Sequence, residues 1–94
     1  MDNETVGILW FKNKNQYLSY LHALTDANEL PRSYTAWLSQ TSLFISQAER
    51  QGLQVMKIHA EVLEVYSWCH KNKINFDTDA CRRFAMLRAR KKCR

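Results

Sequence analysis

Glycine and proline are scarce in this chain, whose 94 residues include two glycines and one proline. Turn-rich β-sandwiches, collagen-like chains and low-complexity linkers need many more of these residues, so the sequence excludes all three. Long apolar runs are missing as well, because no stretch approaches the roughly 20 residues of a membrane span. The opening residues, Met1 to Glu4, carry acids and lack the basic start of a signal peptide. We therefore expect a soluble, cytoplasmic protein.

Recognisable catalytic and cofactor motifs are also missing. Two glycines leave no room for a glycine-rich phosphate loop, and neither a nucleophile elbow nor a paired-carboxylate motif occurs. A catalytic pair could be drawn from Cys69 with His22 or His59, but nothing in the sequence orients it. We predict no enzymatic activity, no catalytic residue and no cofactor.

The three cysteines, Cys69, Cys81 and Cys93, are too far apart for the close pairs that zinc sites use. Cys69 and His70 are adjacent, but on a helix their side chains diverge by about 100°. A mixed site of Cys69 with His59 or Cys81 is the weaker alternative. We expect reduced thiols, with Cys69 in the core, and no bound metal.

Positive charge is concentrated in the second half of the chain. The net charge is +5, yet residues 1–47 hold three basic and four acidic residues, whereas residues 48–94 hold eleven basic and five acidic ones. Such a distribution favours an anionic partner: nucleic acid, an acidic protein or a membrane surface. Cations near a helix C-terminus also stabilise the helix dipole, so a solvated helix end is the alternative. The candidate anion contacts, all after the last acid, are Arg82, Arg83, Arg88, Arg90, Lys91, Lys92 and Arg94.

The spacing of apolar residues predicts two short strands and four helices. The strands are expected over residues 6–11 and 53–59, and the helices over residues 14–27, 34–51, 61–73 and from 77 onward. Asn13 and Ser33 are typical N-caps, with Gln16 placed to return a bond to Asn13, and Gly52 is typical of a helix end. The order β-α-α-β-α-α predicts one mainly helical α+β domain over residues 1–94, with residues 88–94 as a basic, fraying tail.

Helical periodicity also predicts parts of the core. In the last helix, Ala80, Phe84 and Leu87 are expected to face inward. Trp37, Trp68 and Phe84 lie on or beside the apolar stripes of their helices, so we expect the three rings to be buried and in contact. A base-stacking role for the tryptophans is the weaker alternative.

Two features predict a homodimer. Two isolated strands leave unpaired edges, and an isolated pair is marginal in water. Leu43 and Trp10 are apolar residues without an evident place in one small core.

The two halves of the chain show a weak internal similarity. Residues 17–22 and 65–70 align at an offset of 48 residues, and each segment follows a predicted strand. An ancient duplication and a chance likeness of two amphipathic helices both explain this observation.

A pattern in residues 34–86 resembles a family of small, uncharacterised bacterial proteins. The resemblance implies a bacterial source and a compact fold, and it implies no particular activity. The chain departs from the pattern at residues 59–61, where similar sequences often carry Asp-Pro. The shared residues are Trp37, Gly52, Val55-Met56-Lys57-Ile58, Trp68-Cys69, Asp77, Ala80 and Arg82-Arg83-Phe84-Ala85.

These observations predict a non-catalytic binding or assembly module. The alternative is a nucleic-acid-binding accessory protein that uses the C-terminal helix. On a helical wheel, Arg83, Arg90 and Arg94 fall within about 40° of one another. Few of the polar residues that read base edges accompany them, so we expect phosphate contacts without sequence preference.

Overall fold

The computed structural model describes residues 4–92 and confirms a mainly helical α+β fold with the order β-α-α-β-α-α. Every predicted strand and helix overlaps one of the observed elements, and a short 3-10 helix follows the first α-helix. The elements are β1 (Thr5–Leu9), α1 (Lys14–Ala23), η1 (Ala27–Glu29), α2 (Tyr34–Arg50), β2 (Gln54–Ile58), α3 (Val62–Lys71) and α4 (Thr78–Lys92).

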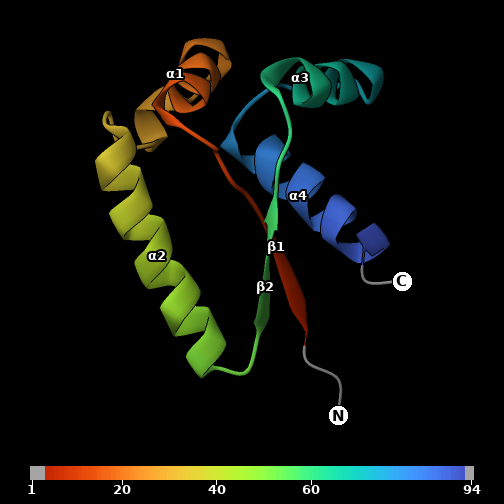
Figure 1. Ribbon diagram of the computed structural model, residues 1–94. Helices are drawn as coiled ribbons and strands as arrows, with labels where there is room; N and C mark the ends of the chain where they lie inside the picture. Colours follow the sequence, from red (N-terminus) through yellow and green to blue (C-terminus); the bar gives the residue numbers. More distant parts are fainter. Residues whose placement is uncertain (1–3, 93–94) are drawn as a thin grey trace.

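The two strands run parallel, with Val6 opposite Val55 and Leu9 opposite Ile58. Parallel strands need a long connection, and here α1, η1 and α2 provide it. Figure 1 shows α2 and α4 on opposite sides of the strand pair, while α1 and α3 lie together beyond the carboxyl ends of the strands. The sheet is therefore a thin layer between α2 and α4, and α1 and α3 cover one end of it.

Small residues let α4 pack directly against β1. Ala85 and Ala89 are fully buried. A Cβ atom on Gly7 would lie 2.2 Å from the Ala85 carbonyl oxygen and 2.8 Å from the Ala89 Cβ. Only glycine at this strand position allows so close an approach of the helix backbone.

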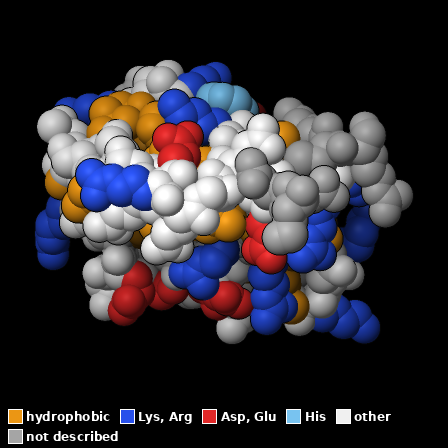
Figure 2. Space-filling view, turned by 90° about the horizontal axis from the view of Figure 1, so that it is seen from below, with side chains coloured by type: hydrophobic (Ala, Val, Ile, Leu, Met, Phe, Trp, Pro, Cys, Tyr) orange, Lys and Arg blue, Asp and Glu red, His pale blue; other side chains and the backbone are white. Residues whose placement is uncertain are grey.

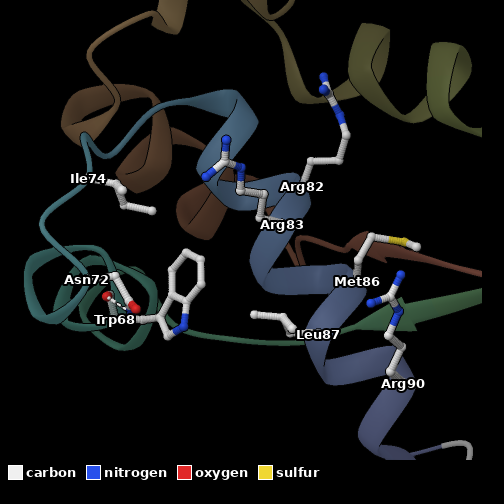
Figure 3. A pocket seen from close by; sticks show the side chains of 8 residues that line it. All are labelled: Trp68, Asn72, Ile74, Arg82, Arg83, Met86, Leu87 and Arg90. Carbon is white, nitrogen blue, oxygen red and sulfur yellow. Dashed lines mark hydrogen bonds between the residues drawn. The ribbon is translucent and has the colours of Figure 1, made fainter.

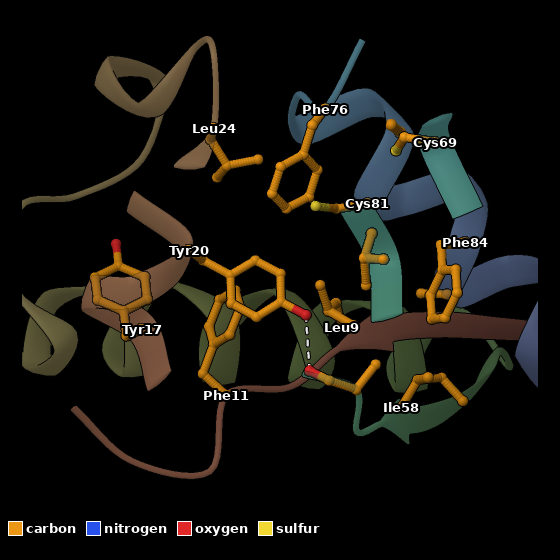
Figure 4. Packing of buried hydrophobic residues seen from close by; sticks show 14 of the residues in the cluster. Leu9, Phe11, Tyr17, Tyr20, Leu24, Ile58, Cys69, Phe76, Cys81 and Phe84 are labelled. Carbon is orange, nitrogen blue, oxygen red and sulfur yellow. Dashed lines mark hydrogen bonds between the residues drawn. The ribbon is translucent and has the colours of Figure 1, made fainter. Parts of the chain in front are cut away.

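Hydroxyl groups of a buried and a half-buried tyrosine connect the core to the chain around it. Tyr20 is fully buried, and Figure 4 shows its ring beside Phe11, with the hydroxyl pointing away from α1. Tyr20 Oη donates to the Ala60 carbonyl at 2.7 Å, and Tyr34 Oη donates to the Phe11 carbonyl at 2.8 Å. These bonds matter because an unsatisfied buried hydroxyl would cost roughly 1–3 kcal/mol.

The predicted cluster of Trp37, Trp68 and Phe84 is only partly correct. Trp68 and Phe84 meet edge to face, with ring centroids 5.7 Å apart, but Trp68 is only half-buried. Trp37 is buried in a different group of aromatic residues. Its ring is stacked on Tyr34, and its centroid lies 5.0 Å from that of Trp10. Trp10 thus has a place at the edge of the core, which removes one of the reasons for expecting a dimer.

The predicted inner face of α4 is wrong at Leu87, whose side chain is 45% exposed. Ala80 and Phe84 are buried as expected, and the inner face continues through Ala89. The close crossing with β1 is the physical reason, because it selects the smallest side chains of the helix. Residues 88–91 are therefore part of a helix that packs on the sheet, although they were predicted as a fraying tail. Cys93 and Arg94 lie outside the described residues.

Helix ends follow the predicted capping residues. Asn13 Oδ1 accepts from the Gln16 N–H at 2.9 Å, and Ser33 Oγ accepts from the Ala36 N–H at 3.0 Å. The side chain of Gln16 does not return a bond to Asn13; its Oε1 accepts from the Lys12 N–H at 2.8 Å. The end of α2 is followed by Gly52, whose φ of 87° suits glycine.

Candidate nucleic-acid interface

Basic side chains do not form one continuous block on the molecule. On the face seen in Figure 2, Lys and Arg lie at several separate places, with Asp and Glu between some of them. A phosphate-binding surface must therefore be found locally, and α4 carries most of the predicted contact residues.

The start of α4 is fixed by hydrogen bonds. Asp77 Oδ1 accepts from the Ala80 N–H at 2.8 Å and so caps the helix. The hydroxyl of Thr78 donates to Asp26 Oδ2 at 2.7 Å, and its N–H donates to Asp26 Oδ1 at 2.9 Å. These bonds anchor α4 to the segment after α1. The burial of one face of α4 against β1 then leaves its arginines on the other side.

Three of the predicted contact residues, Arg82, Arg83 and Arg90, line one hollow of about 590 Å³. Trp68 and Leu87 line the same hollow. Figure 3 shows Ile74, Trp68 and Leu87 pointing toward one another between α3 and α4, with Arg83 above them and Arg90 further along α4. The hollow therefore combines apolar surface with guanidinium groups, as sites for single-stranded nucleic acid do.

A single acid lies beside the first two arginines of α4. Asp79 contacts Arg82 at 3.3 Å and Arg83 at 3.1 Å. All three side chains are more than half exposed, so each ion pair contributes little and exchanges readily with another anion. Two cations share one carboxylate, and the group keeps a net positive charge.

Arg88 has a different role from its neighbours. It pairs with Glu64 of α3, and its guanidinium lies 4.6 Å from the centre of the Phe84 ring. The ion pair joins α4 to α3, and the ring contact, between residues four apart on α4, orients the Arg88 side chain. Arg88 is consequently a structural residue and does not reach the hollow.

Lys91 lies on the opposite side of the Trp68–Leu87 surface. It lines a second hollow of about 500 Å³ together with Lys71, Glu64 and Arg88. The side chain of Lys92 and the whole of Arg94 lie outside the described residues. We use the name α3–α4 face for the following residues around Trp68 and Leu87: Lys71, Arg82, Arg83, Arg90 and Lys91.

Lys71 and Leu87 were missed as site residues, and Trp68 was considered only in the weaker base-stacking alternative. Leu87 could have been found, because on a helix it shares a face with Arg83 and Arg90, four residues before and three after it. The position of Trp68 and Lys71 beside the arginines could not be predicted, because α3 joins this surface through tertiary packing on α4.

The cysteines of the described chain are buried and protonated. Cys69 and Cys81 both belong to the core (Figure 4). Burial is the main cause that raises the pKa of Cys81 to about 12, and it also raises the pKa of Cys69. A protonated thiol is a poor nucleophile and a poor metal ligand. Within the described residues, no three His, Cys, Asp or Glu side chains lie close enough together to hold a metal ion.

Comparisons with known proteins leave the family open. No family model, curated protein or solved structure matches the chain. The resemblance to small bacterial proteins therefore remains a prediction. Across the described residues, no helix has both the length and the apolar character needed to cross a membrane.

Proposed function

We propose that the protein is a non-catalytic binding module that takes nucleic acid, single strands in preference to duplexes, on the α3–α4 face. The observation that carries the proposal is the position of exposed apolar surface between two groups of basic side chains. Arg82, Arg83 and Arg90 lie on one side of Trp68 and Leu87, and Lys71 and Lys91 lie on the other.

Each part of this surface suits one part of a nucleotide chain. Guanidinium groups bind phosphates through paired, charge-assisted hydrogen bonds. Unpaired bases expose flat apolar faces, which the Trp68 and Leu87 side chains can cover. The amide of Asn72, the neutral polar side chain of the first hollow, donates to the Trp68 carbonyl at 2.8 Å. The surface therefore favours binding without sequence preference.

A salt titration tests the electrostatic part of the proposal. If four phosphates are contacted, the log–log slope for single-stranded DNA is about −2.8, at about −0.7 per contact. Affinity should then fall about fifty-fold between about 50 and 200 mM salt. Fluorescence anisotropy of labelled oligothymidine and oligocytidine measures both the slope and the sequence preference.

Substitutions in α4 locate the binding surface. Arg83→Ala and Arg90→Ala should each flatten the slope by about 0.7 without changing the preference among sequences. Arg50→Ala, which removes an exposed cation at the end of α2, is the matched control and should leave the slope unchanged.

Trp68 distinguishes nucleic acid from an acidic protein. Trp68→Leu keeps apolar bulk against Phe84 but removes the flat ring, so it should weaken oligonucleotide binding by about 1–3 kcal/mol. Polyglutamate, a probe for acidic proteins, should bind more weakly than oligothymidine of equal charge. Equal binding of both polymers, or no oligonucleotide binding at low salt, contradicts the proposal.

Self-assembly is the second candidate, and exposed apolar residues on α2 favour it. Leu43 is 61% exposed, and its neighbour Phe44 is 49% exposed. Leu43 lines neither hollow of the α3–α4 face, although Phe44 lines a third hollow together with Arg82.

A further inference from the structure

The outer edge of β1 is a row of backbone groups that the sheet does not use. The Ile58 carbonyl accepts from the Trp10 N–H at 2.8 Å, and the Glu4 carbonyl accepts from the Gln54 N–H at 2.9 Å. Backbone groups alternate in direction along a strand, so the groups of residues 4, 6, 8 and 10 face β2. Those of Gly7 and Leu9 consequently face away from it.

The Gly7 N–H has only a weak acceptor within the described chain. It points at Met86 Sδ, 3.2 Å away, and a thioether sulfur accepts hydrogen bonds poorly. A backbone carbonyl at the same place would be a better partner. Gly7 is buried beneath Met86, so another strand can pair with its N–H once the Met86 side chain moves aside.

An apolar slot of about 410 Å³ lies along this edge. Its lining includes residues 6–9 in succession, although neighbouring side chains of a strand point to opposite faces. Four successive residues can line one cavity only where it follows the strand edge. Trp37 and Phe44 of α2 form one wall, and Cys81 and Met86 of α4 form the other.

The slot lies where a third strand would pair with β1. An extended chain in it would place alternate side chains against α2 and against α4, so both sets must be apolar. Its backbone would pair with Gly7 and Leu9, which is how peptides add to exposed sheet edges elsewhere.

The lining of the slot includes one charged side chain. Arg82 lines it, and Figure 3 shows this side chain pointing away from Arg83, toward the neighbouring α2. Its ion pair with Asp79, at 3.3 Å, is largely exposed. A carboxylate on the incoming segment could therefore reach the guanidinium.

A second copy of this chain fits the slot poorly. The edge of β1 lies between two helices in every copy, so two such edges cannot approach to the roughly 4.8 Å that strand pairing requires. Residues 1–4 are mostly polar and residues 88–94 are mostly basic, so neither segment has the required alternation of apolar residues.

We propose that this slot binds an extended apolar segment of a partner protein as a third strand on β1, with a carboxylate of that segment on Arg82. The proposal can be tested separately from nucleic-acid binding, because Arg83, Arg90 and Trp68 take no part in it. Arg82 lines both sites, so its variants are not used to separate them.

Titration of the isotope-labelled full-length protein with a synthetic peptide tests the proposal. The probe is acetyl-Thr-Val-Ile-Val-Thr-Asp with a C-terminal amide. We expect the Gly7 and Leu9 amide resonances to shift and the exchange of both amides with solvent to slow. The control peptide carries N-methyl groups on the central Val-Ile-Val residues, which keep the side chains but prevent strand pairing, and it should not bind.

Two variants test the contributions of the α2 wall and of the Arg82 charge to peptide binding. Phe44→Ala changes a half-exposed side chain, so the fold should persist, and the peptide should bind about tenfold more weakly. Arg82→Ala should weaken binding up to about fivefold, and a peptide ending in Asn should lose the same factor against the wild type but nothing further against Arg82→Ala.

Three results would overturn the proposal. The first is the absence of any change at Gly7 and Leu9 with millimolar peptide. The second is equal binding of the N-methylated peptide, which would mean that the slot takes apolar ligands without strand pairing. The third is a shift of the Gly7 and Leu9 amides when the protein alone is concentrated, which would mean that a second copy fills the slot.

Discussion

Gly7 is the residue on which the contact between the sheet and α4 depends. A side chain there would meet the backbone of α4, which cannot move aside as a flexible side chain could. Gly52, the other glycine, has a positive φ but open space around it. The two glycines are therefore needed for different reasons, one for closeness and the other for backbone conformation.

Substitution of each glycine by alanine separates these reasons. Gly7→Ala should destabilise the protein by about 3 kcal/mol or more, because it forces α4 away from β1. Gly52→Ala should cost about 1–2 kcal/mol, the strain of a left-handed conformation. Urea unfolding measures both losses, and a smaller loss for Gly7→Ala than for Gly52→Ala would contradict the close packing.

The buried thiols predict how stability depends on pH. Burial raises the pKa of Cys81 to about 12, whereas an unfolded thiol ionises near pH 9.0. Above pH 9 the Cys81 thiol loses its proton in the unfolded chain but keeps it in the folded chain. The contribution of this thiol to the free energy of unfolding is therefore complete below pH 9 and is lost as the pH rises toward 12. The loss for one such thiol is about 1.4 kcal/mol per pH unit.

Urea unfolding at pH 8, 9 and 10 under reducing conditions checks this sign. Stability should fall between pH 9 and 10, and Cys81→Ala should reduce the fall by about 1 kcal/mol. Burial also raises the pKa values of Tyr20 and Cys69, so part of the decline should remain in the variant. An equal slope in the variant would show that Cys81 is not buried in the folded state.

At the scale of elements, α4 contributes three different surfaces to the molecule. One face of α4 packs against β1, and Cys81 and Met86 line the slot beside that strand. The exposed surface of the helix carries the arginines. Local signals were sufficient to predict that this helix exists, since Asp77 caps it and apolar residues recur along it. Its orientation was mispredicted because the close crossing at Gly7 favours Ala89 over the larger Leu87, and no local rule contains that contact.

The parallel pairing of β1 and β2 could not be predicted from the sequence either. The strands were located by their apolar runs, but their direction depends on where the intervening helices pack. For the same reason the participation of α3 in the candidate interface was missed, whereas the arginines of α4 were identified from charge alone.

Truncation of α4 tests whether its last turns belong to the fold. Removal of residues 89–94 deletes Ala89, whose fully buried side chain faces Gly7. The cost should be about 1–3 kcal/mol, the range for loss of core packing. Lys91→Ala, which changes an exposed side chain near the same helix end, is the control and should leave the unfolding curve unchanged. Equal stability of the truncated form and this variant would mean that the helix end is a solvated tail.

At the scale of the whole molecule, the two halves have the same order of elements. Each half is a strand followed by two helices, and α1 and α3 are both ten residues long and begin 48 residues apart. The second helix of each half contacts the strand of the other half, because α4 contacts β1 and α2 contacts β2. The shared order is compatible with both explanations of the internal similarity, so the duplication stays a prediction beside a chance likeness of two amphipathic helices.

The halves differ in how closely their second helix packs on the sheet, and this difference affects which surface is available for assembly. In α4 small residues bring the helix onto the sheet, whereas α2 keeps Leu43 and Phe44 exposed. Pairing of sheet edges between two copies is unfavourable, because β1 is walled by helices and β2 carries Lys57. We predict a dimer through α2, with Leu43 at its centre.

Light scattering coupled to size exclusion tests this assembly at high micromolar concentration. The wild type should have the mass of a dimer, and Leu43→Lys should have that of a monomer, because a charge at the centre of an apolar contact is costly to bury. Leu63→Lys is the matched control: Leu63 is 73% exposed on α3, so its substitution should leave the dimer intact. A wild type that stays monomeric would contradict self-assembly. The only role left for the apolar residues of α2 would then be to line the slot. Loss of the dimer in both variants would place the contact on more than one helix.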